Sequence, residues 1–105
     1  MAWLALFAAG VFEIAWAVAM KYSDGFTKLW PTLTFGVTAW LSFMCLSFAI
    51  KTLPVGTAYA IWTGIGAVGI AIFGIAWLGE PAGLLRVAFI ALIVVGILGL
   101  KITAT

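Results

Sequence analysis

Four long apolar stretches, separated by short polar segments, constrain the fold of this 105-residue chain more than any other feature. The stretches cover approximately residues 3–20, 31–50, 57–78 and 84–100. Each approaches the length of about 17 to 25 residues that a helix needs to cross a bilayer. Because the hydrocarbon core offers no water to the backbone, segments that cross it as single spans must be helical. The sequence therefore predicts an all-α integral membrane protein, with one transmembrane domain over residues 1–105.

The composition excludes several other classes of protein. Only 8% of the residues are charged and 67% are hydrophobic, whereas roughly 25% are charged in an average soluble domain. Histidine is absent and Cys45 is the one cysteine, which argues against a disulfide framework, a Cys/His metal site and His-dependent catalysis. The basic residues are scattered singly, so nucleic acid is not an expected partner. We expect a non-enzymatic protein that is surrounded by lipid.

The basic residues are almost evenly divided between the two sides of the membrane. With four spans, one side carries Lys51 and Lys101, and the other carries Lys21, Lys28 and Arg86. Such a distribution has almost no positive-inside bias. We infer that the chain can insert in either orientation; the alternative is that charge position or the N-terminal amine still selects one.

Glu13 lies near the middle of the first apolar stretch, whereas the other charged residues lie between the stretches or, like Arg86, near the end of one. A charged group at this depth is costly, so it is expected to face the protein interior or water and to have a function. Because desolvation disfavours the anion, the carboxyl is suited to holding a proton and exchanging it for a cation. The alternative is a permanently protonated Glu13 in an interhelical hydrogen bond. We predict that Glu13 binds the proton and the substrate.

Residues three and four positions from Glu13 share its helical face. Ala9, Gly10 and Ala17 are small and allow close approach of a helix or a ligand. Trp16 can stack on a planar cation or donate a hydrogen bond to the carboxylate. This face therefore has the properties of a site wall.

Three residues of the second and third stretches extend this prediction. Ser42 is a hydroxyl at mid-depth, and Tyr59 and Trp62 are three positions apart on one helical face. With Glu13 they would form a polar and aromatic cage that suits a cation. Two alternatives remain open: Ser42 can bond the carbonyl four residues earlier in its own helix, and Tyr59 can be an interfacial anchor.

Glycines mark two further places. Gly64 and Gly66 lie near the centre of the third stretch and predict a kink or hinge, although glycine is common in membrane helices. Gly96 and Gly99 give the last stretch a small-residue patch, suited to dimerisation or to plain packing.

The chain resembles the small multidrug resistance family of proton-coupled exporters, and within it the guanidinium exporter subtype. The resemblance covers essentially the whole chain and rests on Glu13, on KYSDGFTKLWP at residues 21–31 and on GTAYAIWTGIG at residues 56–66. Trp16 and Ser42, with Lys101 after the last predicted helix, resemble the guanidinium subtype more than the quaternary-ammonium multidrug subtype.

The resemblance implies an antiparallel, dual-topology homodimer of eight helices in the bacterial inner membrane. The two Glu13 side chains would share one cavity and bind protons or guanidinium in turn, so that the proton gradient drives export without a cofactor. The resemblance also implies roles for the other residues: Trp16 and Ser42 orient Glu13 by hydrogen bonding, Tyr59 and Trp62 line the cavity, Gly10 leaves room beside the carboxylate, Gly64 and Gly66 form the hinge, and the helix with Gly96 and Gly99 holds the dimer.

Two other functions stay open at this stage. One is export of bulky hydrophobic quaternary ammonium cations, which belongs to the same family. The other is a non-transporting membrane subunit or small pore, in which Glu13 only joins helices. The expected partners are guanidinium or a related small cation, protons, a second copy of the chain and the lipid bilayer.

Overall fold

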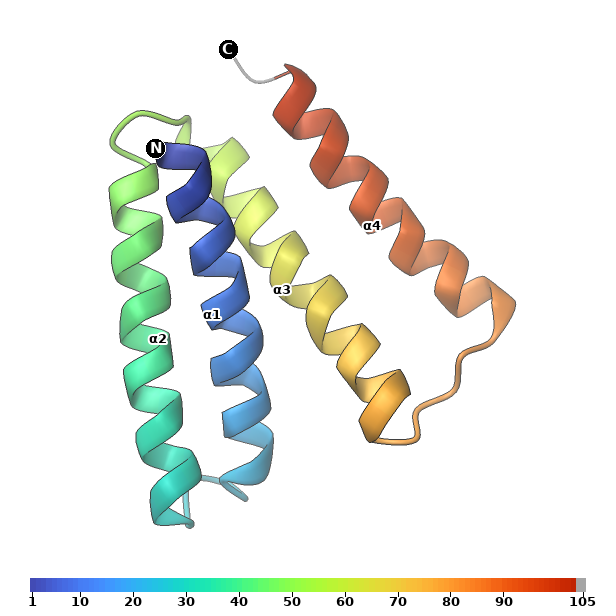
Figure 1. The fold of residues 1–105 in the computed structure, drawn as a ribbon. Helices are drawn as coiled ribbons and strands as arrows, with labels where there is room; N and C mark the ends of the chain where they lie inside the picture. The colour runs from blue at the N-terminus through green and yellow to red at the C-terminus, as the bar shows by residue number, and fades with distance from the viewer. Residues whose placement is uncertain (104–105) are drawn as a thin grey trace.

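The computed structural model describes residues 1–103, which form four α-helices that alternate in direction (Figure 1). These helices are α1 (Ala2–Tyr22), α2 (Leu29–Ala49), α3 (Val55–Trp77) and α4 (Leu84–Thr103). All four are long and apolar enough to cross a membrane. The prediction of an all-α protein with four membrane-spanning helices is therefore confirmed.

The helix ends lie within three residues of the predicted ones. One difference concerns Lys101, which we expected after the last helix and which lies in the last turn of α4. Its ammonium lies 5.0 Å from the ring centroid of Trp3 at the start of α1. The cation–π contact places both residues at the same end of the molecule, as the alternating topology requires.

The connection between α1 and α2 is a compact reversal. Ser23 Oγ donates a hydrogen bond to the Met20 carbonyl at 2.7 Å and accepts one from the Phe26 N–H at 3.0 Å. Asp24, Gly25 and Phe26 all have positive φ angles, of 50°, 71° and 66°. These left-handed residues turn the chain within a few positions, so α1 and α2 pack side by side and antiparallel.

The described helices form a thin layer. The molecule measures 42 × 35 × 16 Å, and its smallest dimension is less than twice the diameter of about 10 Å of one helix. Helix α1 packs against α2 and α3, whereas α4 packs along α3, touches α1 through the Lys101–Trp3 contact, and otherwise stands apart from α1 and α2 in Figure 1. No residue of α4 is buried within the described chain. The arrangement therefore leaves most of α4 open.

Small residues allow close packing in the core, which is centred on α1, α2 and α3. The buried core residues are Leu6, Ala9, Ala49, Ala58, Ile61 and Trp62. Next to this core, Gly10 of α1 faces Ile65 of α3 so closely that a Cβ on Gly10 would lie 2.6 Å from Ile65 Cγ2 and 2.8 Å from its Cβ. The absence of a side chain at Gly10 thus sets how closely α1 and α3 approach.

The substitution Gly10→Ala tests this contact. Because the Cβ of Ile65 cannot rotate away, we expect the added methyl group to separate α1 from α3 and lower the free energy of unfolding by about 1–3 kcal/mol. The measurement is an equilibrium unfolding titration in mixed detergent micelles. Gly36→Ala in α2 is the matched control, since an added Cβ there has no atom within 4 Å. Equal stability of the two variants would contradict the packing argument.

Candidate functional site

The carboxylate of Glu13 lies between α1 and α3, near the middle of both helices. It rests on Gly66, where any Cβ would collide with the carboxylate. Its Oε1 atom is buried and has no hydrogen-bond partner among residues 1–103. A buried acceptor without a donor is unfavourable, so this oxygen is a place where a proton or a cationic donor is stabilised.

Gly66 therefore has a role that the sequence analysis did not identify. We predicted a hinge, whereas here Gly66 makes room for the Glu13 carboxylate. Helix α3 continues without interruption through Gly64 and Gly66 in this conformation. Gly64 faces α4, where an added Cβ would lie 3.0 Å from the Ile97 side chain. The hinge remains a prediction, and both glycines act as packing positions in this structure.

Ser42 joins three helices through two buried hydrogen bonds. Its hydroxyl donates to the Ala9 carbonyl of α1 at 2.7 Å and accepts from Trp62 Nε1–H of α3 at 3.0 Å. The alternative that Ser42 bonds a carbonyl of its own helix is therefore wrong. In a regular α-helix the Ala9 carbonyl is also the acceptor for the backbone N–H of Glu13. Ser42 thus positions the helical turn that carries Glu13.

The family resemblance implies that Trp16 and Ser42 orient Glu13 by hydrogen bonding, and within residues 1–103 of a single chain this does not occur through a bond to the carboxylate itself. Neither Ser42 nor Trp16 bonds the Glu13 carboxylate within the described chain. The hydroxyl of Ser42 is already engaged with Ala9 and Trp62. The indole N–H of Trp16 is buried and has no partner in residues 1–103. A donor and an acceptor, three positions apart on α1, are thus left unpaired in a single chain.

Aromatic rings form a continuous row that includes Trp16. Trp16 contacts Phe43 with a centroid distance of 6.4 Å, and Phe43 contacts Trp62 at 5.7 Å. Trp62 in turn contacts Tyr59 at 5.2 Å, and Trp16 contacts Phe35 at 5.7 Å. The row runs over α1, α2 and α3 and begins on α1 at Trp16, three positions after Glu13.

One of these positions, Trp62, differs from what the resemblance implies. Trp62, implied to line a cavity, is 5% exposed and belongs to the core. Tyr59 is 54% exposed near the start of α3, which is compatible with a cavity wall and with an interfacial anchor. Phe43 was not singled out in the sequence. The one feature of the sequence that could have pointed to Phe43 is its place next to Ser42. Its contacts with Trp16 and Trp62 could not be predicted, because they depend on how the helices are rotated.

Gly96 and Gly99 lie on an open face of α4. An added Cβ at either position meets no atom within 4 Å. The alternative that they serve plain packing within the chain therefore fails for the described residues. Their use in a contact between two copies remains a prediction.

Comparison with known proteins places these features in context. Residues 1–93 match the family model described as Small Multidrug Resistance protein. The guanidinium exporter of Proteus vulgaris is 54% identical over 104 residues, which are 99% of this chain and 100% of that protein. The guanidinium exporter of Escherichia coli K12 is 52% identical over 103 residues, with 98% of both chains covered. The guanidinium exporter of Yersinia pseudotuberculosis is 51% identical, covering 99% of this chain and 100% of that one.

Removing the Ser42 hydroxyl tests the link between the three helices. In Ser42→Ala the buried Trp62 N–H loses its acceptor, so we expect a loss of unfolding free energy of about 1–3 kcal/mol and a shifted indole N–H resonance for Trp62. Ser47→Ala is the matched control, since Ser47 lies on the exposed face of the same helix. An unchanged Trp62 resonance in Ser42→Ala would show that this network does not form.

Proposed function

The chain belongs to the Small Multidrug Resistance family, and we propose on this basis that the protein exports guanidinium from the cytoplasm in exchange for protons, with Glu13 as the residue that binds both. The protein is a transporter and not an enzyme, and it is a multi-pass protein of the bacterial inner membrane. The relatives named guanidinium exporter, more than 50% identical over their whole length, support the substrate. The observation that carries the proposal is the buried, unpaired Glu13 oxygen within a membrane-spanning helix.

The chemistry of guanidinium matches this site. The ion is planar and presents its N–H donors as a fork, which fits a carboxylate in a bidentate manner. It would satisfy the unpaired Glu13 Oε1 and at the same time lie beside the aromatic row that includes Trp16 and Phe43. A buried, charge-assisted pair of this kind is stronger than a neutral hydrogen bond and depends on geometry, so small guanidinyl cations are favoured.

Competition at one carboxylate provides the coupling. A Glu13 that holds a proton has lost the charge that attracts the cation, and a Glu13 that holds the cation has no free charge for a proton. If the site alternately faces the two sides, protons enter from the periplasm and guanidinium leaves. The proton gradient then supplies the driving force, and no cofactor is needed. Bending of α3 at Gly64 and Gly66 is the proposed movement.

Two chains in antiparallel orientation would complete the site. In one chain the helices form a thin layer, α4 has no buried residue, and Gly96 and Gly99 are open. A second copy would cover α4, bring a second Glu13 to the shared cavity and offer partners to the Trp16 N–H. The even division of basic residues permits the two orientations that an antiparallel homodimer requires.

Glu13→Gln is the central test of this function. Glutamine keeps the size of the side chain but cannot carry the negative charge, so we expect proton-coupled guanidinium transport to fall to background. The measurement is uptake of labelled guanidinium into proteoliposomes with an imposed pH gradient. For the unaltered protein, binding of guanidinium should weaken as the pH falls, because protons occupy Glu13. Transport that survives in Glu13→Gln would refute the proposal.

A series of cations tests selectivity. Guanidinium donates hydrogen bonds and is flat, whereas tetraalkylammonium ions have no N–H and are bulky. A site built around an unpaired carboxylate oxygen should therefore prefer guanidinium over tetraethylammonium by at least about tenfold in kcat/KM. Competition between the two ions in the same uptake assay measures this ratio. Equal rates, or a preference for tetraethylammonium, would instead indicate a multidrug exporter.

A further inference from the structure

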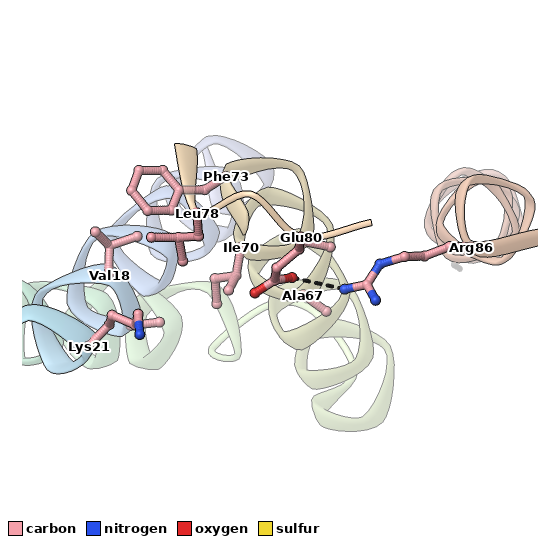
Figure 2. A pocket seen from close by; sticks show the side chains of 10 residues that line it. Val18, Lys21, Ala67, Ile70, Phe73, Leu78, Glu80 and Arg86 are labelled. Carbon is pink, nitrogen blue, oxygen red and sulfur yellow. Dashed lines mark hydrogen bonds and ion pairs between the residues drawn. The ribbon is translucent and has the colours of Figure 1, made fainter. Parts of the chain in front are cut away.

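A second charged site lies at the membrane surface, near the ends of α1 and α3. A cavity of about 360 Å³ lies between the ends of these two helices (Figure 2). Its walls are mostly apolar, and three charged residues line it: Lys21, Glu80 and Arg86. The proposed transport mechanism has so far used none of them.

The inner end of this cavity is adjacent to the site around Glu13. Among its lining residues, Ala17 follows Glu13 by one helical turn, and Ala67 directly follows Gly66, on which the Glu13 carboxylate rests. The outer end is formed by Glu80 and Arg86, in and after the α3–α4 connection. The cavity thus extends from the end of the helices inward to Ala17, one helical turn from Glu13.

The fold holds Glu80 in a defined place. Gly79 has φ +72°, a conformation suited to glycine that reverses the chain after α3. The Glu80 N–H donates to the Gly74 carbonyl at 3.1 Å. Gly74 is buried, and a Cβ there would collide with the Glu80 carboxylate. Two glycines and a backbone hydrogen bond therefore seat this carboxylate against α3.

The partner of Glu80 is itself a guanidinium group. Arg86 Nη2 donates to Glu80 Oε1 at 2.8 Å, which Figure 2 shows as a dashed line. The side chains are 44% and 42% exposed. An ion pair with this exposure contributes little stability, so a free guanidinium ion can replace the arginine by exchanging one guanidinium–carboxylate pair for another. The Glu80 carboxylate thus already binds one guanidinium group, that of Arg86, in this structure.

We propose that Glu80 is a second guanidinium-binding carboxylate at the mouth of this cavity, with Arg86 as a tethered occupant that the substrate displaces on its way to or from Glu13. The proposal rests on the proposed function above and adds a transit site to it. Lys21 lies on the α1 wall and forms no ion pair with Glu80 within the described part of the chain. Its positive charge keeps the cation from residing long, as a transit site requires.

Opposite effects of two substitutions test the displacement. Glu80→Gln removes the binding group, so the KM for guanidinium should rise about threefold to fivefold. Arg86→Gln removes the competitor and leaves Glu80 free, so the KM should fall by a similar factor. Proton coupling should persist in both, because Glu13 is unchanged. If the pair were only structural, both variants would break the same contact and shift KM in the same direction, or leave it unchanged, and either result would overturn the proposal.

A matched control separates this effect from surface charge. Lys28→Gln removes one positive charge from the same side of the membrane, at a residue outside the cavity. We expect its KM for guanidinium to stay within about twofold of the unaltered protein. A fall in KM equal to that of Arg86→Gln would show that the effect is general electrostatic attraction, and would refute displacement of Arg86.

A binding experiment keeps this proposal distinct from the proposed function. Arg86 is the one arginine in the sequence, so its side-chain N–H resonances can be assigned without ambiguity. In the transport-inactive Glu13→Gln variant, guanidinium chloride should shift these resonances saturably, whereas tetramethylammonium chloride at equal ionic strength should not. The shift should vanish in Glu13→Gln/Glu80→Gln.

The outcomes of the two experiments can be told apart. Transport of guanidinium by the unaltered protein, without any saturable shift at Arg86, would overturn the transit site and leave the proposed function intact. A saturable shift at Arg86, together with failure of the unaltered protein to transport guanidinium, would support Glu80 as a binding site and refute the proposed function.

Discussion

The hydrogen bonds that Ser42 makes to Ala9 and Trp62 hold together the part of the molecule on which the functional site depends. In the hydrocarbon core no water can replace a lost partner, so a hydroxyl that bonds two other helices restricts their relative rotation and depth. Helix α1 is joined in this way one turn before Glu13. The Glu13 carboxylate is therefore directed to the surface of α3, where Gly66 leaves room for it.

The chain places two carboxylates in contrasting environments along one side of α3. The Oε1 atom of Glu13 is buried near the middle of α1 and has no partner within residues 1–103. Glu80 is half-exposed and paired with a guanidinium group. A cation that enters from water loses its hydration in steps when it meets a half-exposed carboxylate before a buried one, which lowers the barrier to desolvation at each step. The cavity between α1 and α3 is lined by Glu80 and by Ala17, which lies one helical turn from Glu13.

The thin layer of helices follows from the same physical constraint that excludes a soluble fold. Lipid is as apolar as the side chains of α4, so this helix has no hydrophobic drive to bury itself within its own chain. What drives association in lipid is close packing and the pairing of polar groups. The open glycines of α4 and the unpaired atoms of Glu13 and Trp16 offer both, and a second copy is the occupant that we propose.

The sequence by itself determined the four spans, their approximate ends and the depth of Glu13, because span length and the cost of a charge in lipid depend on local composition. Only the tertiary structure decided that Ser42 bonds Ala9 and Trp62, that Gly66 makes room for the Glu13 carboxylate, and that Glu80 meets Arg86 at a cavity. These contacts depend on how each helix is rotated and which neighbour it meets. Each helix of this chain is apolar on all of its faces. The sequence therefore contains no hydrophobic stripe that would reveal how the helix is rotated.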